Sequence, residues 1–250
     1  MREWICGRNP VYEVLRAARR HFFRLRFAEG AHEDGRINEI LGMAQGIKIP
    51  LERVPRSTLD ALSSGHQGVA LEASGYPYRS LPDILDNAAR RGDPLFVLVL
   101  DTLQDPQNLG TLMRTAEIAA VHGVLLPLRR TVTVTPAVVH ASSGASEHLL
   151  VAQANLAQSI AALKEAGAWV VGLESGPQGL PPEQVRLDGP LALVVGSEGE
   201  GMRSLVRASC DLLLRLPMRG QVGSLNAAVA GSIALYLAWQ ARGFSGRLNG

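Results

Sequence analysis

The chain has 250 residues, a length that fits one or two globular domains. Its 46% hydrophobic and 19% charged residues can build a sizeable core, which excludes an intrinsically disordered protein, while the net charge of +2 excludes no class of partner. The longest uncharged apolar run, Ala227–Trp239, has 13 residues, fewer than the roughly 20 that cross a bilayer. No signal-peptide core follows Arg2 and Glu3, and Cys6 and Cys210 stand without a CxxC motif. We therefore expect a soluble, cytoplasmic protein without a membrane span, disulfides or a zinc site.

The first 74 residues alternate between helix and strand patterns and predict a small α/β domain. Asn9 as N-cap and Pro10 at the first helical position predict a helix that runs through Arg19. Between residues 23 and 27, apolar side chains alternate with arginines, which is the period of a half-buried strand. Further helices are predicted over residues 37–46 and 57–63, and further strands over residues 47–54 and 69–73.

Positive charge is concentrated at the N-terminal end. Residues 1–26 hold seven arginines against Glu3 and Glu13, a local net charge of +5. A basic patch attracts phosphate backbones by counterion release, but a charge run of this size can equally be a solvated face. The first alternative predicts that four of these arginines contact nucleic-acid phosphate: Arg19, Arg20, Arg24 and Arg26.

A linker is predicted after the first domain, because Gly75–Ser80 breaks the alternation. With the helix expected over residues 81–91, we place the first domain at 1–74, the linker at 75–92 and a second domain at 93–246. In the second domain, short apolar runs alternate with helical patterns from Leu95 onward. Because the runs at 95–100 and 191–195 are continuously apolar, we expect strands buried on both faces of a mostly parallel α/β sheet.

Three polar, glycine-containing segments follow predicted strands of the second domain. They are residues 105–110 leading to Arg114, residues 196–201, and residues 217–226. Ligands of open α/β sheets bind beyond the carboxyl ends of the strands, so these segments are candidate site loops. The order G-x-x-G-x-G at 196–201 does not match a dinucleotide fingerprint, and no P-loop is present, so nicotinamide and nucleoside triphosphates are disfavoured. Glu198 and Glu200 suit a ligand with amines or hydroxyls.

The same segments resemble the three motifs of the SpoU-type (SPOUT superfamily, TrmH-like) RNA 2′-O-ribose methyltransferases. In the family's order they read Asn108-x-Gly110-x-x-x-Arg114-Thr115-Ala116, Val194-Val195-Gly196-Ser197-Glu198-Gly199-x-Gly201 and Leu216-Pro217-Met218-x-Gly220-x-Val222-x-Ser224-Leu225-Asn226. At the front, Ile5–Val11 and Gly65–Val69 resemble the ribosomal-protein L30e-like domain of members that modify ribosomal RNA. The sequence is most similar to the group that methylates a guanosine ribose of 23S rRNA. Gln107 departs from the histidine of many members, which leaves the choice of substrate open.

The resemblance implies S-adenosylmethionine as methyl donor, no metal, a homodimer and a C-terminal trefoil knot. The L30e-like domain would then bind RNA. The implied cofactor-binding residues are Gly172, Leu173, Gly196, Gly201, Leu216, Ser224 and Leu225. The implied catalytic residues are Asn108, Arg114, Glu198, Ser224 and Asn226.

Each catalytic candidate also has a plain structural interpretation. Asn108, Ser224 and Asn226 could cap helices, Glu198 could be a helix-start carboxylate, and Arg114 could be a surface arginine. Four of the six histidines, at 66, 122, 140 and 148, lack metal-ligand spacing and are expected to be structural or solvated. The prediction is an S-adenosylmethionine-dependent methyltransferase acting on a guanosine of 23S rRNA. The alternatives are the same chemistry on tRNA or another rRNA nucleotide, and a non-catalytic RNA-binding protein.

Overall fold

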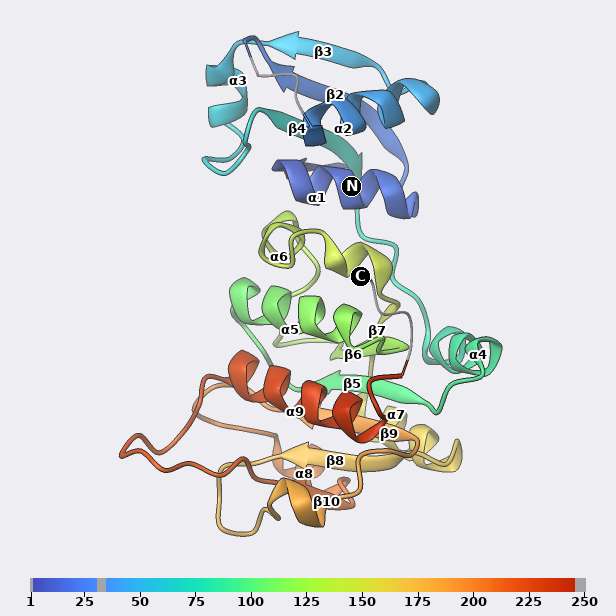
Figure 1. Cartoon of the computed structure of the whole chain (residues 1–250), viewed down its shortest axis with the longest axis vertical. Coiled ribbons are helices and arrows are strands. Elements are labelled where there is room, and N and C mark those ends of the chain that lie inside the picture. Colours follow the sequence, from blue (N-terminus) through green and yellow to red (C-terminus); the bar gives the residue numbers. More distant parts are fainter. Residues whose placement is uncertain (1, 31–34, 246–250) are drawn as a thin grey trace. The chain divides into compact units, whose positions relative to one another are not determined.

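The structure is a computed structural model that describes residues 2–30 and 35–245. The chain divides into two compact units. Unit 1 contains residues 1–77 and 134–148, and unit 2 contains residues 78–133 and 149–250. Figure 1 labels the helices and strands of each unit and colours them by their position in the sequence. Among the described residues, no helix is both long and apolar enough to span a membrane.

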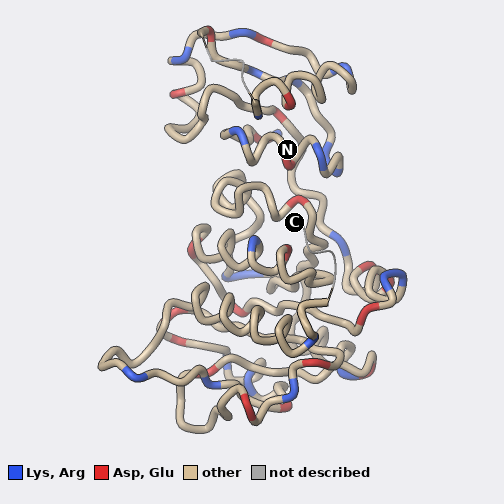
Figure 2. The backbone as a smooth tube through the Cα atoms, in the orientation of Figure 1, with Lys and Arg blue, Asp and Glu red and all other residues tan. Residues whose placement is uncertain are grey.

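Unit 1 is built on a four-stranded sheet of order β1-β4-β2-β3. β1 and β2 are antiparallel to β4, and β3 is parallel to β2. Acidic and basic positions lie close together along this unit in Figure 2. Its elements are β1 (Arg2–Cys6), α1 (Arg8–Ala17), β2 (Phe22–Ala28), α2 (Gly35–Gly46), β3 (Leu51–Val54), α3 (Arg56–Asp60), β4 (Val69–Ser74), α6 (Pro136–Ala141) and the 3₁₀ helix η1 (Ala145–His148).

The predicted elements of residues 9–73 are present, but three are shorter than predicted: α1 ends at Ala17, β3 spans Leu51–Val54 and α3 spans Arg56–Asp60. Two further corrections concern the N-terminus. β1 was not predicted, because its five residues begin with the charged Arg2 and Glu3 and its pairing with β4 is visible only in the fold. Helix α1 begins at Arg8, and the N-cap is Gly7 with φ 102°, so the prediction of Asn9 as N-cap is wrong. Only glycine adopts such a φ without strain, which explains why the helix can begin so soon after β1.

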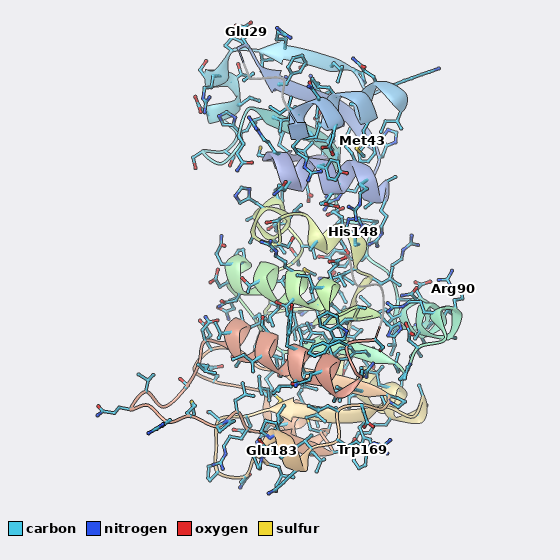
Figure 3. All side chains as sticks on the ribbon, in the orientation of Figure 1. Glu29, Met43, Arg90, His148, Trp169 and Glu183 are labelled. Carbon is cyan, nitrogen blue, oxygen red and sulfur yellow. The ribbon has the colours of Figure 1, made fainter. Side chains whose placement is uncertain are left out.

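Unit 2 contains a six-stranded parallel sheet of order β10-β8-β9-β5-β6-β7. Helices cover both faces of this sheet (Figure 1). Trp169, labelled in Figure 3, is the first residue of β8. Its elements are α4 (Leu81–Arg91), β5 (Phe96–Leu100), α5 (Pro106–Ile118), β6 (Gly123–Pro127), β7 (Val151–Ala154), α7 (Leu156–Glu165), β8 (Trp169–Leu173), the 3₁₀ helix η2 (Pro182–Gln184), β9 (Leu191–Val195), α8 (Ser204–Ala208), β10 (Leu212–Leu214) and α9 (Ala227–Ala241).

Successive side chains along each strand point to opposite faces of the sheet and pack in two separate cores. Val97 and Val99 join the core that also contains residues of α4, α7 and α8. On the other face, α5 packs against α9, and Gly231 of α9 lies so close that an added Cβ would meet Leu112 at 2.5 Å and Val195 at 3.2 Å. Because every residue of β5 and β9 is buried, the continuously apolar runs of the sequence are explained by helices on both faces.

The predicted linker 75–92 is largely a helix of unit 2. Ser80 caps α4 in a capping box with Asp83, and Ile84 and Ala88 are buried in the core of the sheet. A helix whose apolar face is buried in this way is an ordered part of the unit rather than a flexible connection. The boundary between unit 1 and unit 2 therefore lies near residue 77.

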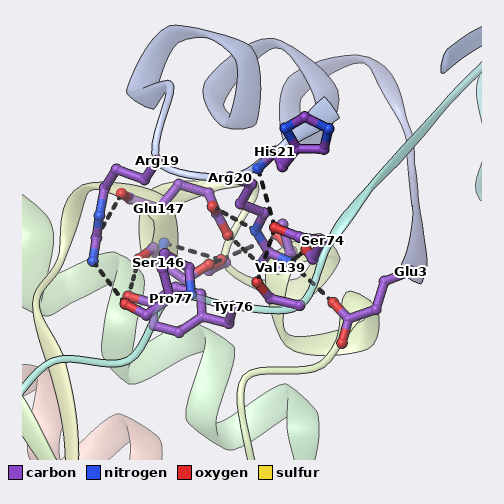
Figure 4. Close-up of polar contacts among 12 residues, drawn as sticks. Glu3, Arg19, Arg20, His21, Ser74, Tyr76, Pro77, Val139, Ser146 and Glu147 are labelled. Atoms are coloured by element: carbon purple, nitrogen blue, oxygen red, sulfur yellow. Dashed lines mark hydrogen bonds and ion pairs between the residues drawn. The ribbon is translucent and has the colours of Figure 1, made fainter. Parts of the chain in front are cut away.

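Residues 134–148 follow β6 of unit 2 in the sequence but pack in unit 1, which the sequence did not indicate. Figure 4 shows the contact that holds them: Arg20 donates to both oxygens of Glu147, at 2.9 and 2.7 Å, and to Glu3 at 2.9 Å. The side chains of Arg20 and Glu147 are completely buried. Burial alone would lower the pKa of Arg20, but the two carboxylates raise it above its ordinary value. We refer to Glu3, Arg20 and Glu147 as the buried ion-pair cluster.

Candidate functional site

A cavity of about 490 Å³ lies at the carboxyl ends of the unit 2 strands. It is formed by the ends of β8 and β9, by the loop that follows β9, and by the segment between β10 and α9. This volume is in the range of small-molecule and cofactor sites. The cavity lies where parallel α/β sheets bind ligands, because the strand carboxyl ends leave a crevice there.

The glycine loop after β9 forms one wall of the cavity. Ser197 and Gly201 exchange backbone hydrogen bonds of 3.0 and 3.1 Å, and Gly199 and Gly201 have φ values of 82° and 69°. At Gly196, a Cβ would lie 2.2 Å from the carbonyl carbon of Gly201, so a side chain there would force the loop open. The predicted glycines are therefore required by the backbone path, which leaves main-chain groups facing the cavity.

An ion pair between the buried Asp101 and the partly exposed Arg203, which the sequence did not indicate, anchors this loop. Asp101, which follows β5 and is completely buried, accepts hydrogen bonds from the backbone N–H of Arg203 at 2.8 Å and from its Nε at 2.8 Å. The two residues are 102 positions apart, and only the parallel pairing of β5 with β9 places them side by side. A lone aspartate after a strand is too common a pattern to have identified the contact.

Three of the predicted catalytic residues meet at the rim of the cavity. The Nδ2 of Asn108 donates to Oε1 of Glu198 at 2.9 Å. The Nδ2 of Asn226 donates to Oδ1 of Asn108 at 3.1 Å and also to Oε1 of Glu198. Glu198 and Asn226 line the cavity, and Asn108 holds both from α5. We refer to these three residues as the carboxamide cluster.

The structural interpretations of these side chains are partly right. Asn226 caps α9, because its Oδ1 accepts from the N–H groups of Ala228 and Val229 at 2.9 and 3.1 Å. Asn108 does not cap α5, which begins at Pro106 with Asp105 as N-cap. Asn108 lies inside the first turn and is buried, so its amide is directed to the cluster rather than to its own helix.

Arg114 and Ser224 are placed differently from the cluster. Arg114 is exposed on α5, six residues after Asn108, so it points about 240° around the helix axis from Asn108. It does not belong to the cavity lining. Ser224 lines the cavity from the exposed segment before α9.

Six of the seven predicted cofactor-binding residues line the cavity: Leu173, Gly196, Gly201, Leu216, Ser224 and Leu225. Gly172 does not. It packs below the wall, where an added Cβ would lie 2.7 Å from Met202 and 2.9 Å from the Sγ of Cys210. Met202 itself lines the cavity, so Gly172 affects the site through packing. The lining also includes three carboxylates, those of Glu174, Glu198 and Glu200.

The predicted phosphate contacts of the N-terminal arginines are not supported. Arg20 is buried in the ion-pair cluster, and Arg19 donates to the backbone carbonyls of Glu147 and Pro77. Arg24 and Arg26 pair with Glu52, and Arg24 also pairs with Glu72 at 2.6 Å. The local charge of +5 was misleading because three of these carboxylates lie outside residues 1–26.

His66 and His122 have structural roles, as expected. His66, which is 1% exposed, accepts from the N–H of Gly68 at 2.8 Å and contacts Asp60 at 2.9 Å. His122 accepts from the N–H of Phe96, and burial lowers its pKa to about 4. Within the described part of the chain, no group of three His, Cys, Asp or Glu side chains is arranged to hold a metal ion.

Two regions of the chain match models of known protein families. Residues 95–236 match the SpoU rRNA Methylase family, and residues 4–79 match a domain described as RNA 2′-O ribose methyltransferase substrate binding. The chain is 41% identical over 245 residues to YacO of Bacillus subtilis, which is named as a TrmH family tRNA/rRNA methyltransferase, with 96% of each chain covered.

Solved structures resemble the whole chain. The SpoU methyltransferase AviRb of Streptomyces viridochromogenes, in complex with AdoMet, has a TM-score of 0.79 at 22% identity, covering 98% of this chain and 91% of that one. An AdoMet-bound rRNA methyltransferase of Sinorhizobium meliloti has a TM-score of 0.78 at 22% identity, covering 96% and 87%. The predicted fold class is confirmed, whereas the trefoil knot stays a prediction.

Proposed function

Since the chain belongs to the SpoU rRNA methylase family of RNA methyltransferases, we propose that it transfers a methyl group from S-adenosylmethionine to a ribose 2′-hydroxyl. The proposed substrate is a guanosine of 23S rRNA, which would place the enzyme in the cytoplasm. The observation that carries the proposal is the carboxamide cluster at the rim of the cavity, formed by Asn108, Glu198 and Asn226 from three separate motifs.

The cavity fits the proposed cofactor chemically. Backbone groups of the glycine loop and the apolar side chains of Leu216, Met218 and Leu225 suit an adenosyl group. The carboxylates of Glu174, Glu198 and Glu200 suit the positive charges of an amino group and a sulfonium. When bound, S-adenosylmethionine supplies an electrophilic methyl group. The proposed binding residues are Leu173, Gly196, Gly201, Leu216, Ser224 and Leu225, with Gly172 acting through packing.

Arg114 is the proposed catalytic residue that faces the ribose. A guanidinium does not lose its proton at neutral pH, so it is a poor base. It can hold the substrate phosphate and stabilise the negative charge that develops on the 2′-oxygen as its proton leaves to water or a phosphate oxygen. The carboxamide cluster and Ser224 shape the pocket in which the ribose is oriented.

A homodimer would bring Arg114 to the site. Within one chain, Arg114 points away from Asn108 on α5. α9, which packs on α5, exposes an apolar face with Val229, Ile233 and Tyr236 at 40 to 46% exposure. We therefore propose that a second copy covers this face and contributes its own Arg114 to the first chain's site. Mixing a chain carrying Arg114→Ala with one carrying Glu198→Gln should then restore activity that neither variant has alone, since one intact site forms per mixed dimer.

The direct test maps 2′-O-methylation across 23S rRNA and tRNA after incubation with S-adenosylmethionine and the purified protein. A modified guanosine in 23S rRNA supports the proposal. Modification of tRNA or of another rRNA nucleotide would correct the substrate and keep the chemistry. If calorimetry finds no S-adenosylmethionine binding and no RNA is modified, the non-catalytic RNA-binding alternative is correct.

A further inference from the structure

Asp101, which follows β5, contacts both ends of the glycine loop that forms one wall of the unit 2 cavity. Its backbone N–H donates to the carbonyl of Val195, the last residue of β9, at 2.8 Å. Its carboxylate accepts from the N–H of Arg203, the N-cap residue of α8, at 2.8 Å. One residue therefore fixes both the point where the loop leaves the sheet and the point where it reaches α8.

The side-chain part of this contact is enclosed and directional. Oδ2 of Asp101 accepts the backbone N–H of Arg203, while Oδ1 accepts from Nε of Arg203 at 2.8 Å and contacts Nη2 at 2.7 Å. Asp101 is completely buried, whereas the side chain of Arg203 is 47% exposed. A buried carboxylate is costly unless its oxygens are hydrogen-bonded, so conformations of the loop that move Arg203 away are strongly disfavoured.

The backbone directly after Asp101 is strained. Thr102 has φ 60°, which is an outlier for a β-branched residue, and its hydroxyl donates to the carbonyl of Asp101 at 2.8 Å. The left-handed turn leads the chain from Asp101 to Asp105, the N-cap of α5. Strain of this kind persists only where the surrounding contacts fix the backbone, and it concentrates at functional sites.

The same two segments of the chain make a second contact at the site. Asn108, in the first turn of α5, donates to Glu198 in the middle of the loop at 2.9 Å. Residues 101–108 thus hold the loop at both ends through Asp101 and at its centre through Asn108. The glycines of the loop give its backbone a large conformational freedom, so a restraint from outside the loop is needed to keep one conformation.

We propose that Asp101 is a positioning residue, which holds the glycine loop in its cofactor-binding conformation before S-adenosylmethionine arrives and keeps Glu198 in reach of Asn108. Asp101 is not among the described residues that line the cavity, so its effect on binding passes through the loop. The inference rests on the proposed function, because it assigns S-adenosylmethionine to this cavity. It assigns to a buried carboxylate the preorganisation of the cavity wall.

The test uses Asp101→Asn in the full-length protein, which keeps the shape of the side chain but directs an NH₂ group at donors of Arg203. In the absence of cofactor, hydrogen exchange of peptides covering residues 196–203 should be faster than in the wild type. The calorimetric Kd of S-adenosylmethionine should rise about tenfold, as expected when the loop is in its binding conformation only about a tenth of the time. With saturating cofactor, single-turnover methyl transfer should approach the wild-type rate, because binding selects that conformation.

Arg203→Ala gives the same test if Asp101→Asn does not fold, because the Arg203 side chain is partly exposed and its backbone N–H contact with Asp101 is kept. Its Kd should rise less than that of Asp101→Asn. Arg203→Lys, which keeps a positive charge beside the buried carboxylate, should restore part of the affinity lost in Arg203→Ala. A lysine variant no better than the alanine variant, with both at the wild-type Kd, would contradict the role of the pair.

Asp211→Asn is the matched control. The carboxylate of Asp211 accepts from the N–H of Val170 at 2.9 Å and pairs with Lys164 at 2.7 Å, the same kind of contact at the amino end of β8. This variant should lose stability in denaturant titration, while the Kd and the exchange of residues 196–203 stay at wild-type values. An Asp101→Asn variant that behaves like this control would overturn the inference.

Failure of the inference and failure of the proposed function give different results. A wild type that binds no S-adenosylmethionine, but whose loop exchange still depends on Asp101, would contradict the proposed function and support the restraint on the loop. A wild type that binds the cofactor and methylates RNA, with loop exchange and Kd unchanged in Asp101→Asn and Arg203→Ala, would overturn the inference alone.

Discussion

Each unit contains a polar cluster drawn from distant parts of the chain, and the two clusters differ in their exposure to solvent. In the buried ion-pair cluster, the side chains of Arg20 and Glu147 are completely enclosed and each charge has a partner. In the carboxamide cluster, Asn108 is buried, but Glu198 and Asn226 are exposed at a cavity. Complete enclosure leaves no space for a ligand, so the first cluster serves folding. The second keeps polar atoms accessible, as binding and catalysis require.

The largest effect is expected at Arg114, which acts with the carboxamide cluster in the proposed mechanism. Arg114→Lys keeps a charge but loses the planar fork, so single-turnover methyl transfer should fall on the order of 10²-fold or more. The rate of methyl transfer should be lower still in Arg114→Ala, while both variants bind S-adenosylmethionine normally. Rates of Arg114→Lys near those of the wild type, with RNA and cofactor saturating, would exclude the assignment. Loss of cofactor binding would instead make the residue structural.

Removing one partner of the buried ion-pair cluster should destabilise the protein without a direct effect on the chemistry. Glu147→Ala leaves Arg20 buried with only Glu3 as partner, so we expect a loss of about 3–5 kcal/mol in the free energy of unfolding. Denaturant titration measures it. Glu52→Gln, which alters an exposed pairing of Arg24 and Arg26, is the control and should cost at most about 1 kcal/mol. Equal losses in the two variants would contradict the distinction between buried and exposed pairs.

His122 tests whether a buried polar group in unit 2 also serves folding only. It is 2% exposed, and its pKa in the folded protein is lowered to about 4 from 6.5, first by burial and then by Arg91. Its stabilising contribution is therefore complete above pH 6.5 and is lost as the pH falls from 6.5 towards 4, because the unfolded state takes up a proton that the folded state rejects.

This contribution amounts to about 3 kcal/mol for a fully expressed shift. Unfolding free energies measured between pH 4 and 8 should show the loss in the wild type, and His122→Asn should reduce the pH dependence. Both proteins should bind S-adenosylmethionine equally at pH 7.5. A variant with the pH profile of the wild type would show that another group is responsible.

Asn226 belongs to the carboxamide cluster and is also a helix cap, so the two roles can be separated with the smallest expected effect on stability. Asn226→Ser keeps an acceptor for the N–H groups of α9 but removes the amide donor to Asn108 and Glu198. We expect stability within about 0.5 kcal/mol of the wild type and reduced methyl transfer. Asn226→Ala should also reduce methyl transfer, and its free energy of unfolding should fall by about 1 kcal/mol because the cap is removed. Equal unfolding free energies for the serine and alanine variants would argue against the capping role.

The structure also changes how unit 1 should be tested. Deleting residues 1–74 removes Arg20, the partner of Glu147, and would leave the buried part of residues 134–148 without its packing. Loss of function in such a deletion could therefore come from unfolding rather than from lost RNA binding. Point variants of exposed side chains in unit 1, such as Arg56, avoid this problem.

The sequence by itself determined the α/β class, most element positions and the segments that form the site. Strand β9 has the predicted ends, because a continuous apolar run is a local signal. The glycine motifs led to the cavity because a backbone path such as that at Gly196 tolerates no side chain. Only the tertiary structure decided which charges are paired. Arg20 with Glu147 and Asp101 with Arg203 are more than 100 residues apart, and no local pattern records a contact made by packing.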